Sequence, residues 1–137
     1  MDVFEAIQQR RSIRAYLDKP VPQDKIMRIL EAARLAPSAV NREPWHFIAV
    51  TDPEKRKTLS EGMFAKFLAR APLVIVACGD KKASPEWYMF DTALAVENII
   101  LTAVNEGLGT CCVGSFDEKQ VAALLGIPDN FEVLLLI

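Results

Sequence analysis

The densest positive charge in the chain lies at Arg10, Arg11 and Arg14, with the hydroxyl of Ser12 between them. If residues 11–16 are extended, Ser12 and Arg14 point to one side, and Arg10 can fold toward the same point from a helix end. Guanidinium groups make bidentate, charge-assisted hydrogen bonds to phosphate oxygens. The segment therefore predicts a phosphate site, although basic residues in a last helical turn often do no more than complement the helix dipole.

A second segment that could contact a ligand is the loop of residues 37–45, which reads Pro-Ser-Ala-Val-Asn-Arg-Glu-Pro-Trp. It has no hydrophobic period, and two prolines stiffen the chain before an apolar strand begins. Its small residues would let backbone amides press against a flat polar heterocycle, and Asn41 adds a side-chain amide. Some loops of this kind only connect two elements, so the residues alone leave a binding role and a connecting role open.

Residues 107–115 form a third segment of interest, Gly-Leu-Gly-Thr-Cys-Cys-Val-Gly-Ser. Its glycines do not make the dinucleotide-binding fingerprint, because they follow a helix instead of preceding one and the sixth position is Cys112. Gly107 is explained as the residue that ends a helix. Gly114 and Ser115, at the end of a short strand, remain a place where backbone can approach a ligand closely.

No set of side chains for acid–base, nucleophilic or metal chemistry is evident. His46 is the only histidine, which excludes a histidine metal cluster and leaves no catalytic triad to assemble. Cys78, Cys111 and Cys112 form no CxxC pair, and we expect them to pack in the core of a protein kept in reducing surroundings. We therefore expect no catalytic residue and no metal, and infer that any chemistry comes from a bound cofactor.

Composition and charge narrow the class of protein further. The 137 residues suit one domain over residues 1–137, and 51% apolar with 25% charged residues is typical of a folded globular chain. A net charge of −2 gives no basic field, which argues against nucleic acid as the main partner. No basic and then apolar leader follows Met1, so we expect a cytoplasmic location.

Helices alternate with short apolar strands along the chain. Helices are predicted at residues 2–10, between Pro22 and Pro37, at 52–72 with Asp52 as N-cap and Pro53 next, at 87–106, and at 117–126 with Asp117 and Gln120 as a capping box. Strands are predicted at residues 11–16, 46–50, 73–78, 110–114 and 131–137. This interleaving predicts an α+β or α/β sandwich around one sheet.

The predicted helix at residues 87–106 is unusually apolar. Thirteen of its twenty residues are apolar and lie nearly all round the helical wheel, which indicates burial in a core or a subunit interface. Asp91, Glu97 and Asn98 interrupt it too often for a membrane span. We expect these three side chains to make backbone or interface hydrogen bonds.

Three segments, taken together and in order, resemble the nitroreductase family: residues 10–14, residues 37–47, and Glu97-Asn98 leading to Gly107-Leu108-Gly109-Thr110. The resemblance extends along essentially the whole chain. It implies an α+β fold, a three-layer α/β/α sandwich with a central mixed, mainly antiparallel sheet and a long buried helix at the interface of a homodimer. It also implies FMN as cofactor, NADH or NADPH as donor, and reduction of nitroaromatics, quinones or related acceptors by a ping-pong mechanism.

The resemblance also assigns cofactor-binding residues. One subunit would contact the flavin through Arg10, Arg11, Ser12 and Arg14, and through the backbone of Cys112, Val113, Gly114 and Ser115. The other subunit would contribute Pro37, Ser38, Ala39 and Asn41. Arg14, near the pyrimidine edge, would stabilise the anionic reduced flavin by charge pairing.

Two features depart from the family pattern. Family members usually continue well beyond a strand such as residues 131–137, so we expect this domain to lack the family's C-terminal segment. Residues 63–67 lack the polar side chain expected near the flavin. Three other functions stay open: a flavin-binding protein without turnover, another flavin reaction (dehalogenation, enone reduction or flavin fragmentation) on the same scaffold, and a ligand-free interaction domain.

Overall fold

The structure is a computed structural model that describes residues 1–137. Its helices are α1 (Val3–Gln9), α2 (Gln23–Arg34), α3 (Pro53–Leu59), α4 (Tyr88–Asn105) and α5 (Glu118–Leu125), with 3-10 turns η1 (Ala39–Asn41) and η2 (Lys66–Arg70). Its strands are β1 (Trp45–Val50), β2 (Val74–Asp80) and β3 (Phe131–Leu136). They form one antiparallel sheet in the order β1-β2-β3.

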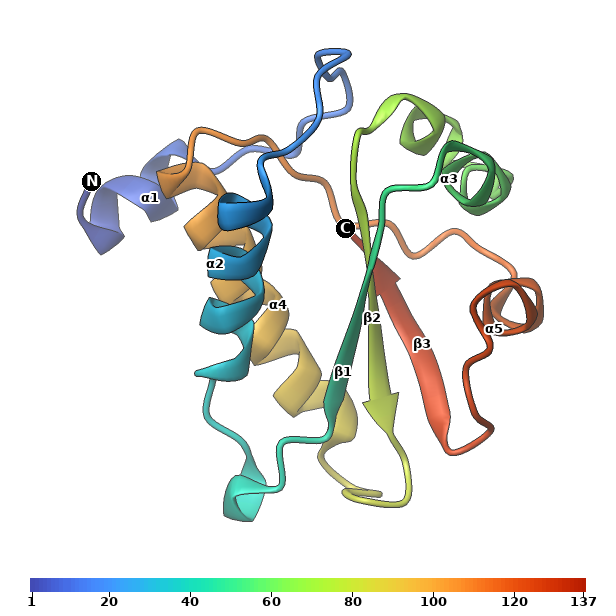
Figure 1. Cartoon of the computed structure of the whole chain (residues 1–137). Helices are drawn as coiled ribbons and strands as arrows, with labels where there is room; N and C mark the ends of the chain where they lie inside the picture. The colour runs from blue at the N-terminus through green and yellow to red at the C-terminus, as the bar shows by residue number, and fades with distance from the viewer.

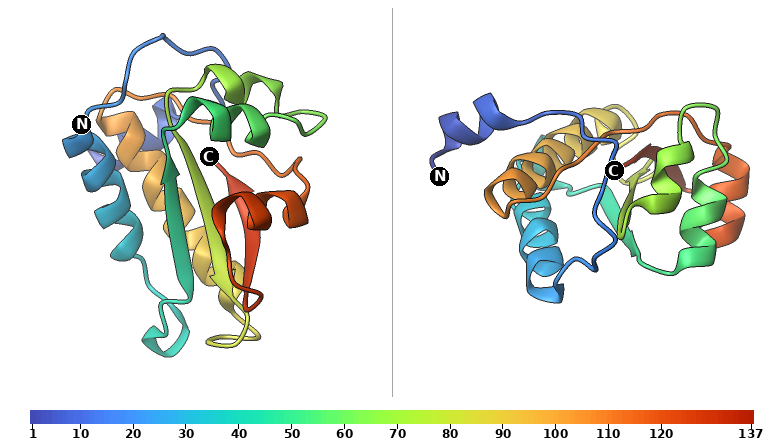
Figure 2. Two further views of the ribbon diagram at one scale, coloured as in Figure 1. Left: turned by 45° about the vertical axis from the view of Figure 1, so that its right-hand side comes forward. Right: turned by 90° about the horizontal axis from the view of Figure 1, so that it is seen from above.

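The sheet is the middle layer of three, as the sequence predicted. Helices α2 and α4 cover one face of the sheet, and α3, η2 and α5 cover the other (Figure 1 and Figure 2). Residues of β2 point alternately into the two cores, with Val74 and Val76 on one side and Ile75 and Ala77 on the other. The continuous apolar run of β2 follows from its burial on both faces. The α+β fold is confirmed.

Local signals placed the start of α3 and both ends of α5 correctly. The Asp52 carboxylate accepts a hydrogen bond from the Lys55 N–H at 2.9 Å, and Pro53 occupies the first turn of α3. Asp117 caps α5 in the same way, and Gly126 ends that helix with φ 66°. These contacts join residues three or four apart, which is why sequence alone suffices to predict them.

The predicted strands at residues 11–16 and 110–114 are wrong as regular strands. Each segment pairs at single residues only: Ser12 forms a parallel bridge with Thr110, and Val113 forms an antiparallel bridge with Leu136. The two segments lie closely against each other, since a Cβ on Gly109 would lie 2.8 Å from the Ile13 side chain. The Ser12–Thr110 bridge is therefore the one parallel element beside an antiparallel sheet.

The single helix predicted over residues 52–72 is also wrong. Helix α3 ends at Leu59, and the chain re-forms only a short 3-10 turn at η2. The break lies where Gly62 packs on a distant segment, because a Cβ there would be 2.0 Å from the Ser115 carbonyl oxygen. A tertiary contact of this kind overrides helix propensity.

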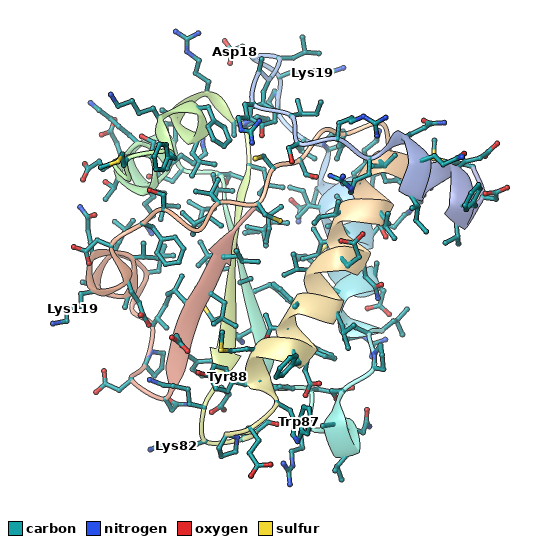
Figure 3. All side chains as sticks on the ribbon, turned by 180° about the vertical axis from the view of Figure 1, so that it is seen from behind. Asp18, Lys19, Lys82, Trp87, Tyr88 and Lys119 are labelled. Carbon is teal, nitrogen blue, oxygen red and sulfur yellow. The ribbon has the colours of Figure 1, made fainter.

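Helix α4 has one buried face and one exposed face. Its buried residues include Ala95, Val96 and Ile99, whereas Phe90 and Leu94 are exposed by 65% and 48%. Near its start the Tyr88 hydroxyl donates to the Glu132 carboxylate of β3 at 2.6 Å, which fixes that end of α4 to the sheet (Figure 3). Core burial therefore accounts for one face of α4 only, and the predicted alternative of a subunit interface stays a prediction for the other face. No helix combines the length and apolar character needed to cross a bilayer.

Candidate functional site

The arginine segment follows α1 and crosses the glycine-rich segment that follows α4. The Ile13 N–H donates to the Thr110 carbonyl oxygen at 2.8 Å, and Gly109 leaves room for Ile13. The Tyr16 hydroxyl donates to the Ile13 carbonyl, which holds the next turn of chain. Residues 10–16 are thus fixed by the distant segment at Gly109 and Thr110 and by a hydrogen bond of their own, although they form no strand.

Two of the three arginines are free to bind an anion. Arg10 and Arg14 make no ion pair or side-chain hydrogen bond, and the ion pairs of the chain are Arg28–Glu106 and Arg34–Glu31. Arg11 differs, because its guanidinium donates to the carbonyl oxygens of Gln8 and Arg10 at 2.8 and 2.7 Å. Arg11 would have to leave these end-of-helix carbonyls before it could bind a ligand.

Arg14 and the segment 112–115 meet at one cavity. The cavity has a volume of about 210 Å³, and its walls include Arg14, the four residues Cys112, Val113, Gly114 and Ser115, and the rings of Phe64 and Phe67. Val113 fixes this wall, because it exchanges hydrogen bonds of 2.7 and 3.0 Å with Leu136. No atom lies within 4 Å of the position that a Gly114 Cβ would take, so the backbone there is open to a ligand.

The sequence did not predict that aromatic rings form one wall of this cavity. Phe64 lies in the segment between α3 and η2, and its N–H donates to Ser115 Oγ at 3.2 Å. With the close approach of Gly62 to Ser115, this bond holds the segment beside the glycine-rich wall. The predicted helix over residues 52–72 concealed the break. An apolar Phe64 and Phe67 stand where a polar residue was expected.

Cys112 also lines the cavity, so the expectation that it packs in the core is wrong, whereas Cys78 and Cys111 are buried as expected. Partial desolvation raises the pKa of the Cys112 thiol, and the neighbouring Cys111 adds to the increase. Burial raises the pKa of Cys78 to about 11. Cys78 and Cys112 therefore carry neutral thiols near pH 7, which is unsuited to nucleophilic catalysis.

The loop with Pro37, Ser38, Ala39 and Asn41 lies at the opposite end of α4 (Figure 1). Its Ala39 N–H donates to both carboxylate oxygens of Asp91, at 3.3 and 3.2 Å, in the first turn of that helix. Asp91 lies 14 residues before Asn105, so about 21 Å of α4 separates this contact from the segment after Asn105. The structure therefore divides the predicted cofactor residues of one chain into two distant groups.

The other polar residues considered in the sequence lie outside the two groups of predicted cofactor residues, or contact one of these groups by a hydrogen bond. Asn98 donates to the Ala32 carbonyl at 3.0 Å, and Asp91 accepts from Ala39, which confirms the expected backbone hydrogen bonds. Glu97 is exposed, and His46 packs on Phe131 with ring centroids 5.4 Å apart. No three His, Cys, Asp or Glu side chains lie close enough together to hold a metal ion.

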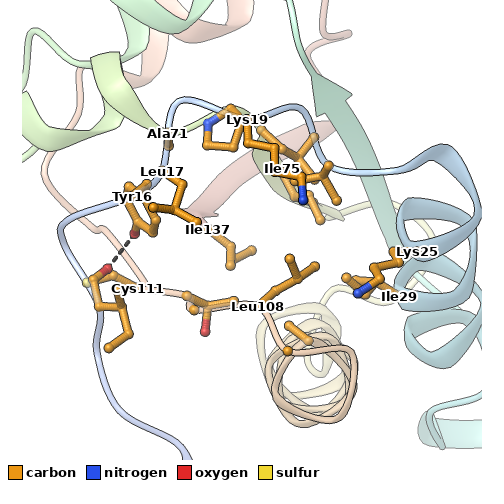
Figure 4. Close-up of a pocket in the computed structure, with 18 of the residues that line it drawn as sticks. Tyr16, Leu17, Lys19, Lys25, Ile29, Ala71, Ile75, Leu108, Cys111 and Ile137 are labelled. Atoms are coloured by element: carbon orange, nitrogen blue, oxygen red, sulfur yellow. Dashed lines mark hydrogen bonds between the residues drawn. The ribbon is translucent and has the colours of Figure 1, made fainter.

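A larger cavity of about 420 Å³ lies beneath residues 13–22 (Figure 4). Its walls are mostly aliphatic and include Leu17, Ile29, Ile75, Leu108 and Ile137. Two of its polar groups are already engaged, since Tyr16 donates to Ile13 and Lys25 donates to the Glu106 carbonyl. Burial also raises the pKa of Tyr16 to about 12, so its hydroxyl stays a neutral donor. We assign no cofactor contact to this cavity.

Comparison with known proteins adds the family. A model of the nitroreductase family matches residues 7–67 and 58–137. A protein of Archaeoglobus fulgidus, named as a candidate NADH dehydrogenase/NAD(P)H nitroreductase, is 41% identical over 140 residues, which cover 96% of this chain and 80% of that protein. An FMN reductase [NAD(P)H] of Bacillus subtilis is 31% identical over 98% of this chain and 59% of its own length.

Solved structures agree with the sequence matches. The FMN-dependent nitroreductase of Clostridium difficile R20291 superposes with a TM-score of 0.88 at 34% identity, covering 97% of this chain and 83% of that one. A nitroreductase family protein of Clostridium novyi NT gives a TM-score of 0.93 at 31% identity, covering 99% and 82%. Both likenesses extend over nearly all of the chain described here.

Proposed function

The chain belongs to the nitroreductase family, and on that premise we propose that it is an FMN-dependent oxidoreductase that uses NADH or NADPH to reduce nitroaromatics, quinones or related acceptors. The observation that carries the proposal is the cavity that joins the unpaired guanidinium of Arg14 to the open backbone of Gly114. A flat, partly anionic ligand fits such a site, because it needs a cation at its edge and unobstructed backbone along its ring.

The residues fit FMN in three respects. Arg10 and Ser12 lie on the same segment as Arg14 and would hold the phosphate and ribityl chain, while Arg11 would join them after leaving its backbone partners. The backbone of residues 112–115 would lie along the isoalloxazine ring. Arg14 would face the pyrimidine edge and stabilise negative charge there.

When bound, FMN would supply the redox chemistry, which is hydride transfer from the nicotinamide and electron transfer to the acceptor. The chain itself binds, orients and shields. Phe64 and Phe67 offer an apolar surface beside the ring, and Cys112 contributes a neutral thiol. No side chain of the cavity needs to act as an acid or base. Donor and acceptor would use the same place in turn, which gives ping-pong turnover.

We propose a homodimer because the two groups of cofactor residues lie at opposite ends of α4. About 21 Å of helix keeps Ala39 and Asn41 from the cavity of their own chain, so both groups can hold one flavin only if they come from two chains. Unpartnered apolar side chains support this arrangement: Phe4 of α1 and Phe90 and Leu94 of α4 are 66%, 65% and 48% exposed. Large exposed apolar surfaces of this kind mark interfaces.

Two coarser features belong to the same proposal. Residues 1–137 form one nitroreductase-like domain, because alternate residues of β2 belong to each of the two hydrophobic cores and so join them. Three free thiols suit a reducing compartment, which supports a location in the cytoplasm.

The experiment that tests the function is an absorbance spectrum of the purified protein after FMN is added and free FMN is removed, followed by anaerobic addition of NADH or NADPH. Retained absorbance near ~450 nm that bleaches with the nicotinamide and returns with a quinone or nitroaromatic supports the oxidoreductase. A yellow protein that never bleaches indicates flavin binding without turnover. Bleaching without reaction of those acceptors indicates a different flavin reaction, which product analysis identifies. A colourless protein refutes the cofactor site.

A further inference from the structure

Asp91 is a buried carboxylate in a core that is otherwise almost wholly apolar. It is 4% exposed, and no cation pairs with it. Both of its oxygens instead face the N–H of Ala39, at 3.3 and 3.2 Å. Burying a carboxylate is costly unless it is hydrogen-bonded, so its contact with this one turn of chain needs a reason beyond packing. A carboxylate in the first turn of α4 would complement the helix dipole without this contact, so the dipole does not explain it.

The turn that Asp91 contacts has a strained backbone. Val40, Asn41 and Glu43 have φ values of 53°, 54° and 49°, in the left-handed region that favours glycine. For a β-branched residue such as Val40 this conformation is a true outlier. Val40 is also 85% exposed, so burial of its side chain does not compensate the strain. Strain of this kind persists only where the surroundings hold it, and it concentrates at functional sites.

Only Asp91 ties residues 38–43 to the rest of the fold by a hydrogen bond. The remaining bonds of the turn are internal: the Glu43 N–H donates to Ser38 Oγ at 2.9 Å, and the Asn41 N–H donates to the Ser38 carbonyl at 3.0 Å. The internal bonds close the turn, whereas the bond from Ala39 to Asp91 decides where it lies relative to α4. Without the carboxylate, the internal hydrogen bonds would keep the shape of the turn, but the turn would be free to move relative to α4.

We propose that Asp91 is a positioning residue that holds the strained turn 38–43 where Ala39 and Asn41 meet the flavin bound by the other subunit. This inference rests on the proposed two-chain flavin site. It means that a change at Asp91 acts on the site of the partner and leaves the chain's own Arg14 cavity intact. Asp91 would act on the flavin site only through Ala39, whose N–H donates to its carboxylate.

The first test measures FMN dissociation constants, by fluorescence quenching, for Asp91→Ala, Asp91→Asn and the control Glu86→Gln. Glu86 is exposed just before α4 and has no hydrogen-bond partner, so Glu86→Gln should bind FMN like the parent protein. We expect Asp91→Ala to weaken FMN binding about tenfold, the effect of one charge-assisted hydrogen bond. Asp91→Asn keeps an acceptor oxygen of the same size, so it should lose less and remain folded if the alanine variant does not.

The second test shows whether the effect crosses between subunits. Asp91→Ala and Arg14→Ala chains with different tags are co-expressed, and the mixed dimer is isolated by both tags. One site of that dimer then combines the intact Arg14 cavity of one chain with the intact turn of the other. We expect the mixed dimer to bind about one FMN with the affinity of the unsubstituted protein, although the Asp91→Ala and Arg14→Ala homodimers both bind FMN weakly.

The outcomes separate the two proposals. Normal FMN binding by both Asp91 variants, together with weak binding by Arg14→Ala, overturns the positioning role and leaves the proposed function standing. Weak binding at both sites of the mixed dimer overturns it too, because Asp91 would then act within its own chain or on folding. Normal FMN binding by Arg14→Ala overturns the flavin site itself, and the inference with it.

Discussion

Substitution of Gly62 by alanine tests the contact that holds the aromatic wall of the cavity. The new methyl carbon would lie 2.0 Å from the Ser115 carbonyl oxygen and 2.7 Å from its carbonyl carbon, where an ordinary contact is 3.4 Å or more. Both neighbours are backbone atoms, so no flexible side chain can yield and the two segments must separate by more than an ångström. Overpacking of this kind costs about 1–3 kcal/mol of unfolding free energy. That cost lowers the melting temperature by roughly 3–5 °C per kcal/mol in a domain of this size.

The matched control for Gly62→Ala is Gly114→Ala in the same cavity. Gly114 does not have a positive φ, and no atom lies within 4 Å of its Cβ position, so the methyl group should leave the melting temperature unchanged. It would instead occupy space along the proposed flavin ring and weaken FMN binding. We therefore expect thermal unfolding to show the loss of stability in Gly62→Ala, and FMN titration to show the loss of binding in Gly114→Ala. A Gly62→Ala protein as stable as the parent would refute the account of the break between α3 and η2, and so would equal losses of stability in both variants.

Three further results are expected. Arg14→Ala should weaken FMN binding about 10- to 100-fold by titration, because it removes a charge-assisted contact, whereas Arg34→Ala removes only an exposed pair with Glu31; equal loss in both variants would count against the site. Val40→Gly should raise the melting temperature, by relief of about 1 kcal/mol of left-handed strain, whereas Val40→Ala keeps a Cβ and most of that strain; equal effects would mean that φ is not the cause. Because burial raises the folded-state pKa of Tyr16 from 10.0 to about 12, its contribution to stability is full below pH 10 and is lost as the pH rises toward 12. Denaturant unfolding should show that decline in the parent and less of it in Tyr16→Phe, and parallel curves would contradict it.

The features predicted correctly from sequence depend on neighbours in the chain. Asp52 and Asp117 cap helices through N–H groups three residues ahead, and β2 shows its two-sided burial in its own composition. From residue type alone, the arginine segment was recognised as a possible phosphate site and Gly114 and Ser115 as a possible backbone contact, and both roles stay predictions. The structure brings Arg14 and residues 112–115 together at one cavity, which the sequence could suggest only through resemblance to a family.

The features missed depend on partners far away in the chain. The break after Leu59 follows from the contact of Gly62 with Ser115, and the lost strands follow from single-residue crossings such as Ser12 with Thr110. No local rule predicts a positive φ at Val40, because valine disfavours that conformation and Asp91, which holds the turn, is 51 positions away from it along the chain. An apolar helix face has the same pattern in sequence whether a core or a second subunit covers it, which is why the sequence left both alternatives open for α4.

Helix α4 links these features, because each of its ends carries one half of the proposed flavin site. Its first turn holds the loop through Asp91, and the segment after its last turn leads through Gly109 to the wall at residues 112–115. In a two-fold dimer that pairs the exposed faces of α4, each helix would set the position of a loop in one site and of a cavity wall in the other. Flavin binding and dimer formation would then be linked equilibria, since a ligand that contacts two chains stabilises their association by the same free energy that association adds to ligand binding. A separated chain would offer FMN its own Arg14 and residues 112–115 but not the turn 38–43 of a second chain, and it would bind FMN with only part of the affinity of the dimer.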